Sequence, residues 1–442
     1  MTKTIIAALL ALLAFNSFAA DLLVTNATLW TDDGPRAGRE LLIREGRVAR
    51  VARAGSTTPA AGTRILDARG DTLLPGLIDA HVHLVSGVRL PQEFGGLERA
   101  RVAAMQLLRS GVTSGRIHLW GLATAAQFAA ETGDAASSAP RLVYGGPGLF
   151  GGQPDWYADD GNAWGVRDSA DAELKLRRLR EAGIQWVTLH SLDRFAPGEA
   201  SAIVKYAHRL GLRVGAQGDS LASVQQAVSL GVDSIEYLDR SDSQEYPADL
   251  VAALQARRGS TFLVPAIGFP FRYAAYRQGR LDLDDARLTE FMPPAVAEFA
   301  RHAMHEDQDR PIPYAPEWRE VPAPTPAKFR QLARSKLPLV TGTDCGSPLH
   351  SQADAIWWEL ETWRQLGVPL PEIVRAATRR AAELLGDPAA GHLRPGAHGD
   401  FVLYRGSLAD GPLSVARVRS VAKGGVLFVD EGQWTAPAAP GT

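Results

Sequence analysis

The chain has a single cysteine, Cys345, among 442 residues. No intrachain disulfide can form, which excludes the disulfide-stabilised scaffolds of small secreted domains. Stability must come from a buried core, and 45% hydrophobic and 22% charged residues are typical of one large globular domain or two unequal ones. In a strand, Cys345 faces away from its neighbour Asp344, so we expect a buried, unreactive thiol; a nucleophile is the alternative.

The chain also lacks an excess of charge, since its formal net charge is -2. This balance provides no basic surface for nucleic acid and no strongly acidic tail. We therefore expect the partner to be a small-molecule substrate and not a nucleic acid. Charge and composition leave the oligomeric state open, and a homo-oligomer is compatible with both.

The sequence has no long apolar run, and the longest of its short apolar runs lies near the N-terminus. Lys3 precedes an apolar stretch over residues 5–15, and the small residues Ser17 and Ala19 follow it. This pattern is typical of a signal peptide, so we predict that residues 1–19 are removed on export to the periplasm or the exterior. A membrane anchor is the alternative, but the run is shorter than the roughly 20 residues that span a bilayer. We expect no membrane association after cleavage.

The two ends of the remaining chain share one pattern of short apolar runs separated by turn residues. It occurs in residues 20–75 and again in 389–442, as in a small antiparallel sheet. We predict that both ends together form one small β-sandwich domain.

Residues 76–388 alternate between strand-like and helix-like patterns. Helical periodicity is clear in residues 97–110, 171–182, 197–210, 221–230 and 326–335. The strand candidates are "LIDAHVHL", "VTSGRIHLW", "RLVYGG", "IQWVTLH", "RVGAQGD", "SIEYLD", "TFLVPAI" and "PLVTGTD". Eight strands alternating with helices predict an α/β fold, a (β/α)8 TIM-like barrel, and an open sheet is the alternative. The irregular segment 267–325 is rich in proline and aromatic residues; it is expected to be a lid over the barrel mouth or a packed surface insertion.

The first strand candidate carries three polar residues at alternate positions: Asp79, His81 and His83. In a strand these side chains share one face. Two imidazoles in a row suit one metal ion, whereas in a core each would need its own hydrogen-bond partner. Because the active site of a (β/α)8 barrel lies at the C-terminal ends of its strands, the pattern predicts a metal site there.

Several stretches resemble the amidohydrolase superfamily, in the family's order and over nearly the whole mature chain. They are "LPGLIDAHVHL", "SGVTSGRIHLWG", "AHRLGLRVGAQ", "AVSLGVDSIEY", "LVTGTDCG", "AATRRAAELLG" and "GHLRPGAHGDFVLY". In detail they are similar to the branch of imidazolonepropionases and of bacterial enzymes that cleave Xaa-Pro dipeptides. The resemblance implies a barrel, a β-sandwich from both chain ends, and one or two metal ions held by ligands on strands one, four, five, six and eight.

The match to the family's metal ligands is incomplete. His81, His83 and Asp344 match, but the ligand positions on the fourth, fifth and sixth strands read Thr188, Gln217 and Tyr237. A neutral threonine hydroxyl cannot replace the carboxylated lysine that the family uses to bridge two cations. The resemblance therefore implies a mononuclear site with one divalent metal ion, zinc by preference, on His81, His83 and Asp344.

Other polar residues at the strand ends are candidates for substrate binding. They are Tyr237, Gln217, His118, His190 and His350. His190 and Asp219 lie two residues beyond Thr188 and Gln217, which places them roughly 7 Å nearer the barrel mouth and too far away to replace the lost ligands. For each candidate, a hydrogen-bonded residue at the barrel rim is the alternative.

Two further features concern the loops near the expected site. The family's Gly-Gly-His loop reads "FGGQPDW", with Gln153 in place of the histidine. Aromatic residues that would rim a pocket, or belong to the core, are Trp120, Trp156, Tyr157 and Trp164.

The resemblance implies hydrolysis of a carbon-nitrogen bond in an amide or cyclic amide. Asp344 is the expected catalytic residue, since its carboxylate can take a proton from water and pass it to the leaving nitrogen. Tyr237 would polarise the substrate carbonyl. The alternative is a non-catalytic binding protein that keeps the fold without the metal centre, because the same histidines and aspartate can form a buried hydrogen-bond network.

Overall fold

The structure is a computed structural model that describes residues 20–85, 87–118, 121–134, 136–151, 158–159, 162–306, 321–347 and 349–435. The signal peptide expected at residues 1–19 lies outside the described residues, as do Trp120, Gln153, Trp156 and Tyr157. Among the helices in the described ranges, none is long and apolar enough to cross a membrane.

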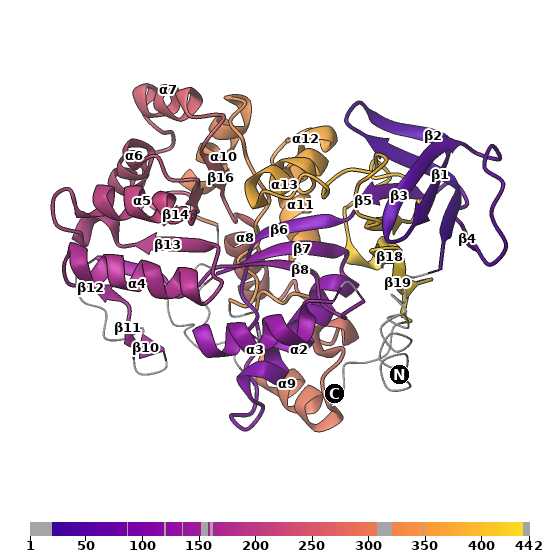
Figure 1. The fold of residues 1–442 in the computed structure, drawn as a ribbon, viewed down its shortest axis with the longest axis horizontal. Helices are drawn as coiled ribbons and strands as arrows, with labels where there is room; N and C mark the ends of the chain where they lie inside the picture. Colours follow the sequence, from indigo (N-terminus) through magenta and orange to yellow (C-terminus); the bar gives the residue numbers. More distant parts are fainter. Residues whose placement is uncertain are drawn as a thin grey trace, which may run out of the picture.

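The chain has a mixed α/β fold (Figure 1). Its strands are β1 Leu22–Thr31, β2 Gly34–Arg44, β3 Arg47–Arg53, β4 Arg64–Asp67, β5 Thr72–Pro75, β6 Leu77–Val82, β7 Val112–Ile117, β8 Arg141–Tyr144, β9 Leu149–Gly151, β10 Ala158–Asp159, β11 Asn162–Ala163, β12 Gly165–Val166, β13 Trp186–His190, β14 Arg213–Gln217, β15 Ser234–Glu236, β16 Phe262–Val264, β17 Phe401–Tyr404, β18 Val418–Lys423, β19 Val426–Asp430 and β20 Gln433–Trp434.

The α-helices are α2 Gly96–Arg109, α3 Leu122–Thr132, α4 Ser169–Glu181, α5 Glu199–Arg209, α6 Leu221–Leu230, α7 Ala248–Ala256, α8 Gly268–Arg277, α9 Pro294–Glu306, α10 Pro324–Arg334, α11 Ala355–Gln365, α12 Leu370–Ala376 and α13 Arg379–Leu385. Five of them, α2, α4, α5, α6 and α10, follow the periodic stretches of the sequence closely. Local sequence signals determine where several of these helices begin or end. The Asp168 side chain accepts from the backbone N–H of Asp171 at the start of α4, and Gly231 ends α6 in the left-handed conformation.

Both ends of the chain contribute to one nine-stranded sheet, in the order β20-β19-β18-β17-β5-β1-β2-β3 with β4 paired to β1. Figure 1 shows the indigo N-terminal strands beside the yellow C-terminal ones. The two ends meet where β5 pairs antiparallel with β17. The prediction that both ends build one β-rich unit is confirmed, while the boundaries at residues 75 and 389 stay predictions.

The remaining strands form a three-stranded sheet, β6-β7-β8, and a six-stranded sheet, β12-β9-β13-β14-β15-β16, with a separate β10-β11 pair. In the three-stranded and six-stranded sheets the strand pairs are parallel. The strands β6, β7 and β13 are buried along their whole length, as expected for parallel strands covered on both faces. A parallel bridge between Gly145 and Trp186 links the end of β8 to β13.

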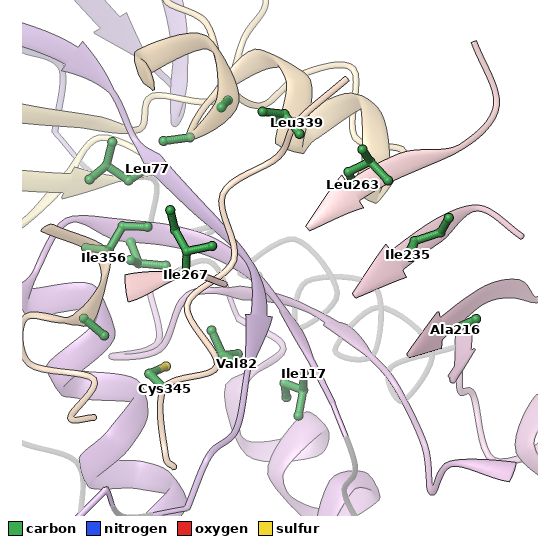
Figure 2. Packing of buried hydrophobic residues seen from close by; sticks show 14 of the residues in the cluster. Leu77, Val82, Ile117, Ala216, Ile235, Leu263, Ile267, Leu339, Cys345 and Ile356 are labelled. Atoms are coloured by element: carbon green, nitrogen blue, oxygen red, sulfur yellow. The ribbon is translucent and has the colours of Figure 1, made fainter. Parts of the chain in front are cut away.

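The expected eighth strand, residues 338–344, is not a regular strand. It makes single bridges, from Leu339 to Leu263 of β16 and from Cys345 to Val82 of β6, and Figure 2 shows Cys345 close to Val82. A reason lies in Gly342, where a Cβ atom would approach the Cβ of His81 to 2.8 Å. The backbone therefore passes closer to β6 than an ordinary residue allows.

The segment expected to be irregular, residues 267–325, is largely helical where it is described. It contains α8, the 3-10 turn η2 Ala286–Thr289, and α9. Gln106 of α2 donates to the backbone oxygens of Leu288 and Glu290, at 3.2 Å each. This part of the segment is packed against α2, which supports the packed-insertion alternative.

Candidate metal centre

His81 lies in β6 and is almost completely buried, with 2% of its surface exposed. Its Nδ1 is 2.9 Å from Oε2 of Glu236. Burial acts to raise the pKa of Glu236, but Arg116 and His81 outweigh it and hold that pKa below its usual value. An ionised carboxylate only accepts, so Nδ1 of His81 carries a proton, and in the neutral imidazole Nε2 presents a lone pair.

His83 follows the end of β6, and a second acceptor fixes its tautomer in the same way. Its Nδ1 is 3.1 Å from the backbone oxygen of His118, which can only accept. The Nε2 atom of His83 therefore also presents a lone pair. It faces Oδ1 of Asp344 at 3.0 Å.

Asp344 completes the cluster from the segment next to β6, where its backbone N–H donates to the oxygen of His81. Its Oδ1 is also 3.6 Å from Nε2 of His81. Burial acts to raise the pKa of Asp344, but its contact with His83 and the neighbouring imidazole of His81 outweigh burial and hold that pKa below its usual value. Two lone pairs thus converge on an anionic oxygen, an arrangement that requires a cation between them or a proton on one imidazole.

These three residues fit a metal ion. Their ligand atoms all lie within 4.8 Å of one another. Ligands that share a tetrahedral zinc ion at about 2.0–2.1 Å are separated by about 3.3 Å, which matches the 3.0 and 3.6 Å separations from Asp344. The hydrogen bonds from Nδ1 of His81 and of His83 are those that orient metal-binding imidazoles.

Arg116 and Glu236 form a fully buried ion pair behind His81. Arg116 donates to Oε1 of Glu236 at 2.7 Å and to the oxygen of Ala80 at 2.6 Å. Its guanidinium also lies over the Trp186 ring, 4.2 Å from the centroid. Arg116 and Ser234 both donate to Oε1 of Glu236, while its Oε2 contacts Nδ1 of His81, so the pair orients the imidazole.

His118 is buried beside the cluster but cannot share an ion with His81. The two rings are stacked, with centroids 3.8 Å apart and planes only 2° from parallel. An imidazole binds a metal in its own plane, and parallel planes do not meet. Although ligand atoms of His81, His118 and Glu236 also lie within 4.8 Å of one another, that second group cannot hold one ion through both rings.

Tyr237 places its hydroxyl 3.3 Å from Nε2 of His81. Burial and the nearby carboxylates raise its pKa well above the usual value, so the hydroxyl keeps its proton. Glu236 and Tyr237 are consecutive, yet both contact the imidazole of His81. This is possible because Tyr237 has φ 69°, a left-handed conformation that ends the alternation of β15.

The sequence profile of the amidohydrolase family matches residues 72–426. The chain belongs to the amidohydrolase family. The resemblance stated from the sequence is thereby confirmed.

Individual relatives of this amidohydrolase are distant or match only in part. An adenine deaminase of Ruegeria pomeroyi is 38% identical over 78 residues, which are 17% of this chain and 13% of the deaminase. An imidazolonepropionase of an Anaeromyxobacter species is 34% identical over 134 residues, 28% of this chain and 31% of that enzyme. Both matches cover well under two thirds of the relative.

A solved structure is similar over nearly the whole chain. The crystal structure of a Xaa-Pro dipeptidase with methionine bound in its active site has a TM-score of 0.71 and 19% identity, and covers 93% of this chain and 100% of the dipeptidase chain. At that identity the likeness concerns the fold.

Thr188 and Gln217 stand at two positions where the family has metal ligands and this amidohydrolase does not. Thr188 contacts His118, its Oγ1 lying 3.3 Å from Nδ1. Gln217 ends β14 and interacts with His190, whose ring stacks on Phe150 at a centroid distance of 4.4 Å. Burial lowers the pKa of His190 to about 4, although the hydrogen bond with Gln217 opposes this. The side chains of Thr188 and Gln217 therefore contact neighbouring histidines.

The other residues expected at the site lie near it in different environments. Asp79 is not in the ligand cluster; it accepts from the backbone N–H and the hydroxyl of Thr343, at 3.0 and 2.7 Å. His350 is buried, and burial lowers its pKa to about 3. Trp164 is buried in the core, as one of the two alternatives proposed. Cys345 is fully buried, and burial raises the pKa of its thiol well above the usual value.

Sequence reasoning missed Arg116 and Glu236. A signal for both was available: each is the one charged residue among the acidic and basic types in a short strand candidate, in "VTSGRIH" and "SIEY". Buried charges are rarely tolerated unless they are paired, so opposite charges in two such strands predict a pair.

Proposed function

We propose that this amidohydrolase hydrolyses a carbon-nitrogen bond, with one divalent metal ion, zinc by preference, on His81, His83 and Asp344. The observation that carries the proposal is the convergence of two oriented imidazole lone pairs on one ionised carboxylate oxygen. Two imidazoles and a carboxylate are also a known ligand set of catalytic zinc sites. The fold shared with a Xaa-Pro dipeptidase makes Xaa-Pro dipeptides the first substrate class to test.

We further infer that eight segments form one closed (β/α)8 barrel. In order around the barrel they are β6, β7, β8, β13, β14, β15, β16 and residues 338–345. The single bridges from β8 to β13, from β16 to Leu339 and from Cys345 back to β6 support this closure. The ligand cluster then lies at the C-terminal ends of its strands, where active sites of such barrels occur.

The chemistry that such an ion supplies when bound is polarisation of a carbonyl and a lowered pKa of water. The chain supplies the proton transfers and the positioning. Asp344, ionised at neutral pH, accepts a proton from water and returns it to the leaving nitrogen. The hydroxyl of Tyr237 remains protonated and donates to the substrate carbonyl oxygen as negative charge develops there.

The second candidate function is a non-catalytic binding protein. It is favoured by the neutral residues Thr188, Gln217 and Tyr237 at three ligand positions of the family. A proton on His83 would then satisfy Asp344 without a metal ion. For either function we propose export, on the signal-like pattern of residues 1–19.

Elemental analysis of the purified protein tests the metal site. We expect close to one zinc ion per chain in the wild type, and none in a His81→Ala, His83→Ala double variant. The matched control is His302→Ala with His305→Ala, which removes two exposed histidines of α9 and should keep the zinc. No metal in the wild type, even after incubation with zinc or manganese, would contradict the proposal and favour the binding protein.

The zinc-loaded protein should then be assayed with a panel of Xaa-Pro dipeptides, cyclic amides and lactones. Hydrolysis of a C–N substrate that is lost in the double variant supports the proposed function. Zinc binding with hydrolysis of lactones only would contradict the proposed bond type and leave the metal site standing.

A further inference from the structure

A cleft of about 410 Å³ lies away from the metal centre, between the nine-stranded sheet and the helices α12 and α13. One wall comes from β1, β2 and the turn between them, and the other from α12 and residues 391–394. Figure 1 shows these helices next to that sheet. None of His81, His83 and Asp344 lines the cleft.

The cleft carries an excess of positive charge. Its lining includes four arginines, Arg36, Arg39, Arg375 and Arg394, against two aspartates, Asp32 and Asp33. A concave surface with one dominant sign concentrates its field and attracts ions of the opposite sign.

Carboxylates pair with three of these arginines, Arg36 with Asp33, Arg394 with Asp32 and Arg375 with Glu372, and leave Arg39 over. One oxygen of Asp32 accepts from Arg394 and also from Arg379, the latter at 3.0 Å. Arg39 is partly buried, and within the described residues it donates no side-chain hydrogen bond and has no ion pair. Its guanidinium is thus a two-point donor without an acceptor among the described residues, in a cleft whose Asp32 is already shared.

The same cleft has an apolar part. Trp30 is only 9% exposed, and Val51, Pro371 and Leu393 also line it. A bare inorganic anion would leave this part without a contact. An organic anion would place its charge on the arginines and its apolar part against these side chains.

We propose that the cleft binds a small organic carboxylate with an apolar body. The planar guanidinium fork of Arg39 matches the two oxygens of a carboxylate, and Arg394, although paired with Asp32, adds positive charge to the same cleft. The proposal is independent of the metal centre and of turnover. Phenylacetate carries both required parts, while acetate and inorganic phosphate carry only the charge.

Isothermal titration calorimetry at constant ionic strength tests this proposal on the full chain. We expect saturable binding of one phenylacetate per chain, weaker binding of acetate and phosphate, and about a tenfold loss of phenylacetate affinity in Arg39→Gln. The control Arg50→Gln changes an exposed arginine of the same sheet that does not line the cleft and should bind as the wild type does. The His81→Ala, His83→Ala variant should also keep the affinity, which excludes binding at the metal centre.

Three results would overturn the proposal. The first is no saturable binding of phenylacetate, and the second is equal affinity in the wild type and Arg39→Gln. The third is phosphate binding as strong as that of phenylacetate, which would show an anion site that makes no use of the apolar wall.

Discussion

Glu236 holds the imidazole of His81 in one tautomer, and Arg116 holds Glu236. We expect Glu236→Gln to reduce zinc affinity about 10- to 100-fold, because a neutral amide orients the imidazole less well. It should also reduce the free energy of unfolding by about 3–5 kcal/mol, since the buried charge of Arg116 loses its partner. Competition with a zinc-binding dye and urea unfolding measure the two effects.

Glu298→Gln is the control, because Glu298 is exposed on α9. Reduced stability of Glu236→Gln with unchanged zinc affinity would mean that Glu236 serves only to balance Arg116.

The hydroxyl of Tyr237 is expected to act on the substrate and not on the metal ion. Tyr237→Phe should therefore keep its zinc but lower kcat about 100-fold, the usual effect of removing one donor to a developing oxyanion. Steady-state kinetics on a substrate found in the panel, together with zinc analysis, checks this. Loss of zinc with the hydroxyl would instead make Tyr237 a ligand.

The sequence predicts the cluster of His81, His83 and Asp344 better than its surroundings. His81 and His83 follow the regular alternation of a strand, and the resemblance adds Asp344. The contact of Tyr237 with His81 depends on the backbone φ angle of Tyr237. The contact of Glu236 with His81 depends on Arg116 in β7, which lies more than a hundred residues away in the sequence. Alternation alone places Glu236 and Tyr237 on opposite faces, so it cannot show that both reach one imidazole.

At the scale of elements, hydrogen bonds of Asp171 stabilise helix α4 in a way that depends on pH. Asp171 accepts from Lys175 at 2.6 Å and from Arg167 at 3.1 Å. Burial acts to raise the pKa of Asp171, but these hydrogen bonds outweigh it and hold the pKa at about 2. Because the folded-state pKa lies below the unfolded value of about 3.9, this stabilisation is complete above pH 4 and is lost as the pH falls through 2.

We therefore expect Asp171→Asn to lower the free energy of unfolding by about 1–2 kcal/mol at pH 6. The difference from the wild type should shrink as the pH falls from 4 to 2. Urea unfolding at several pH values measures it, and a difference that is constant with pH would assign the effect to packing. Asp242→Asn, at an exposed site, is the control.

Two elements differ from their sequence patterns for local reasons. The high proline content of residues 267–325 predicts irregular structure. However, Pro294 begins α9 and Pro270 lies in the first turn of α8, where proline is tolerated. The expected strand at 338–344 contains Gly342, which allows close approach to β6 at the expense of regular pairing. Such effects depend on tertiary neighbours that periodicity does not show.

For the whole molecule, the pairing of β5 with β17 joins the two chain ends. Truncation after residue 388 removes β17 to β20 and leaves the buried edge of β5 without partners. We expect this variant to aggregate, because an unpaired apolar edge recruits other strands. Size-exclusion chromatography measures it, and truncation after residue 435 should remain as soluble as the full chain. A soluble monomer lacking residues 389–442 would contradict this expectation.

The same pairing also fixes an order of events during synthesis. More than 300 residues separate Pro75 of β5 from Phe401 of β17, and at about 5–20 residues per second a ribosome needs roughly 15–60 s to make them. Throughout that interval the N-terminal strands exist without the strand that completes their sheet. A sheet begun by the N-terminal strands is therefore completed only after the whole intervening segment has been made, and the nascent chain depends on other protection until β17 arrives.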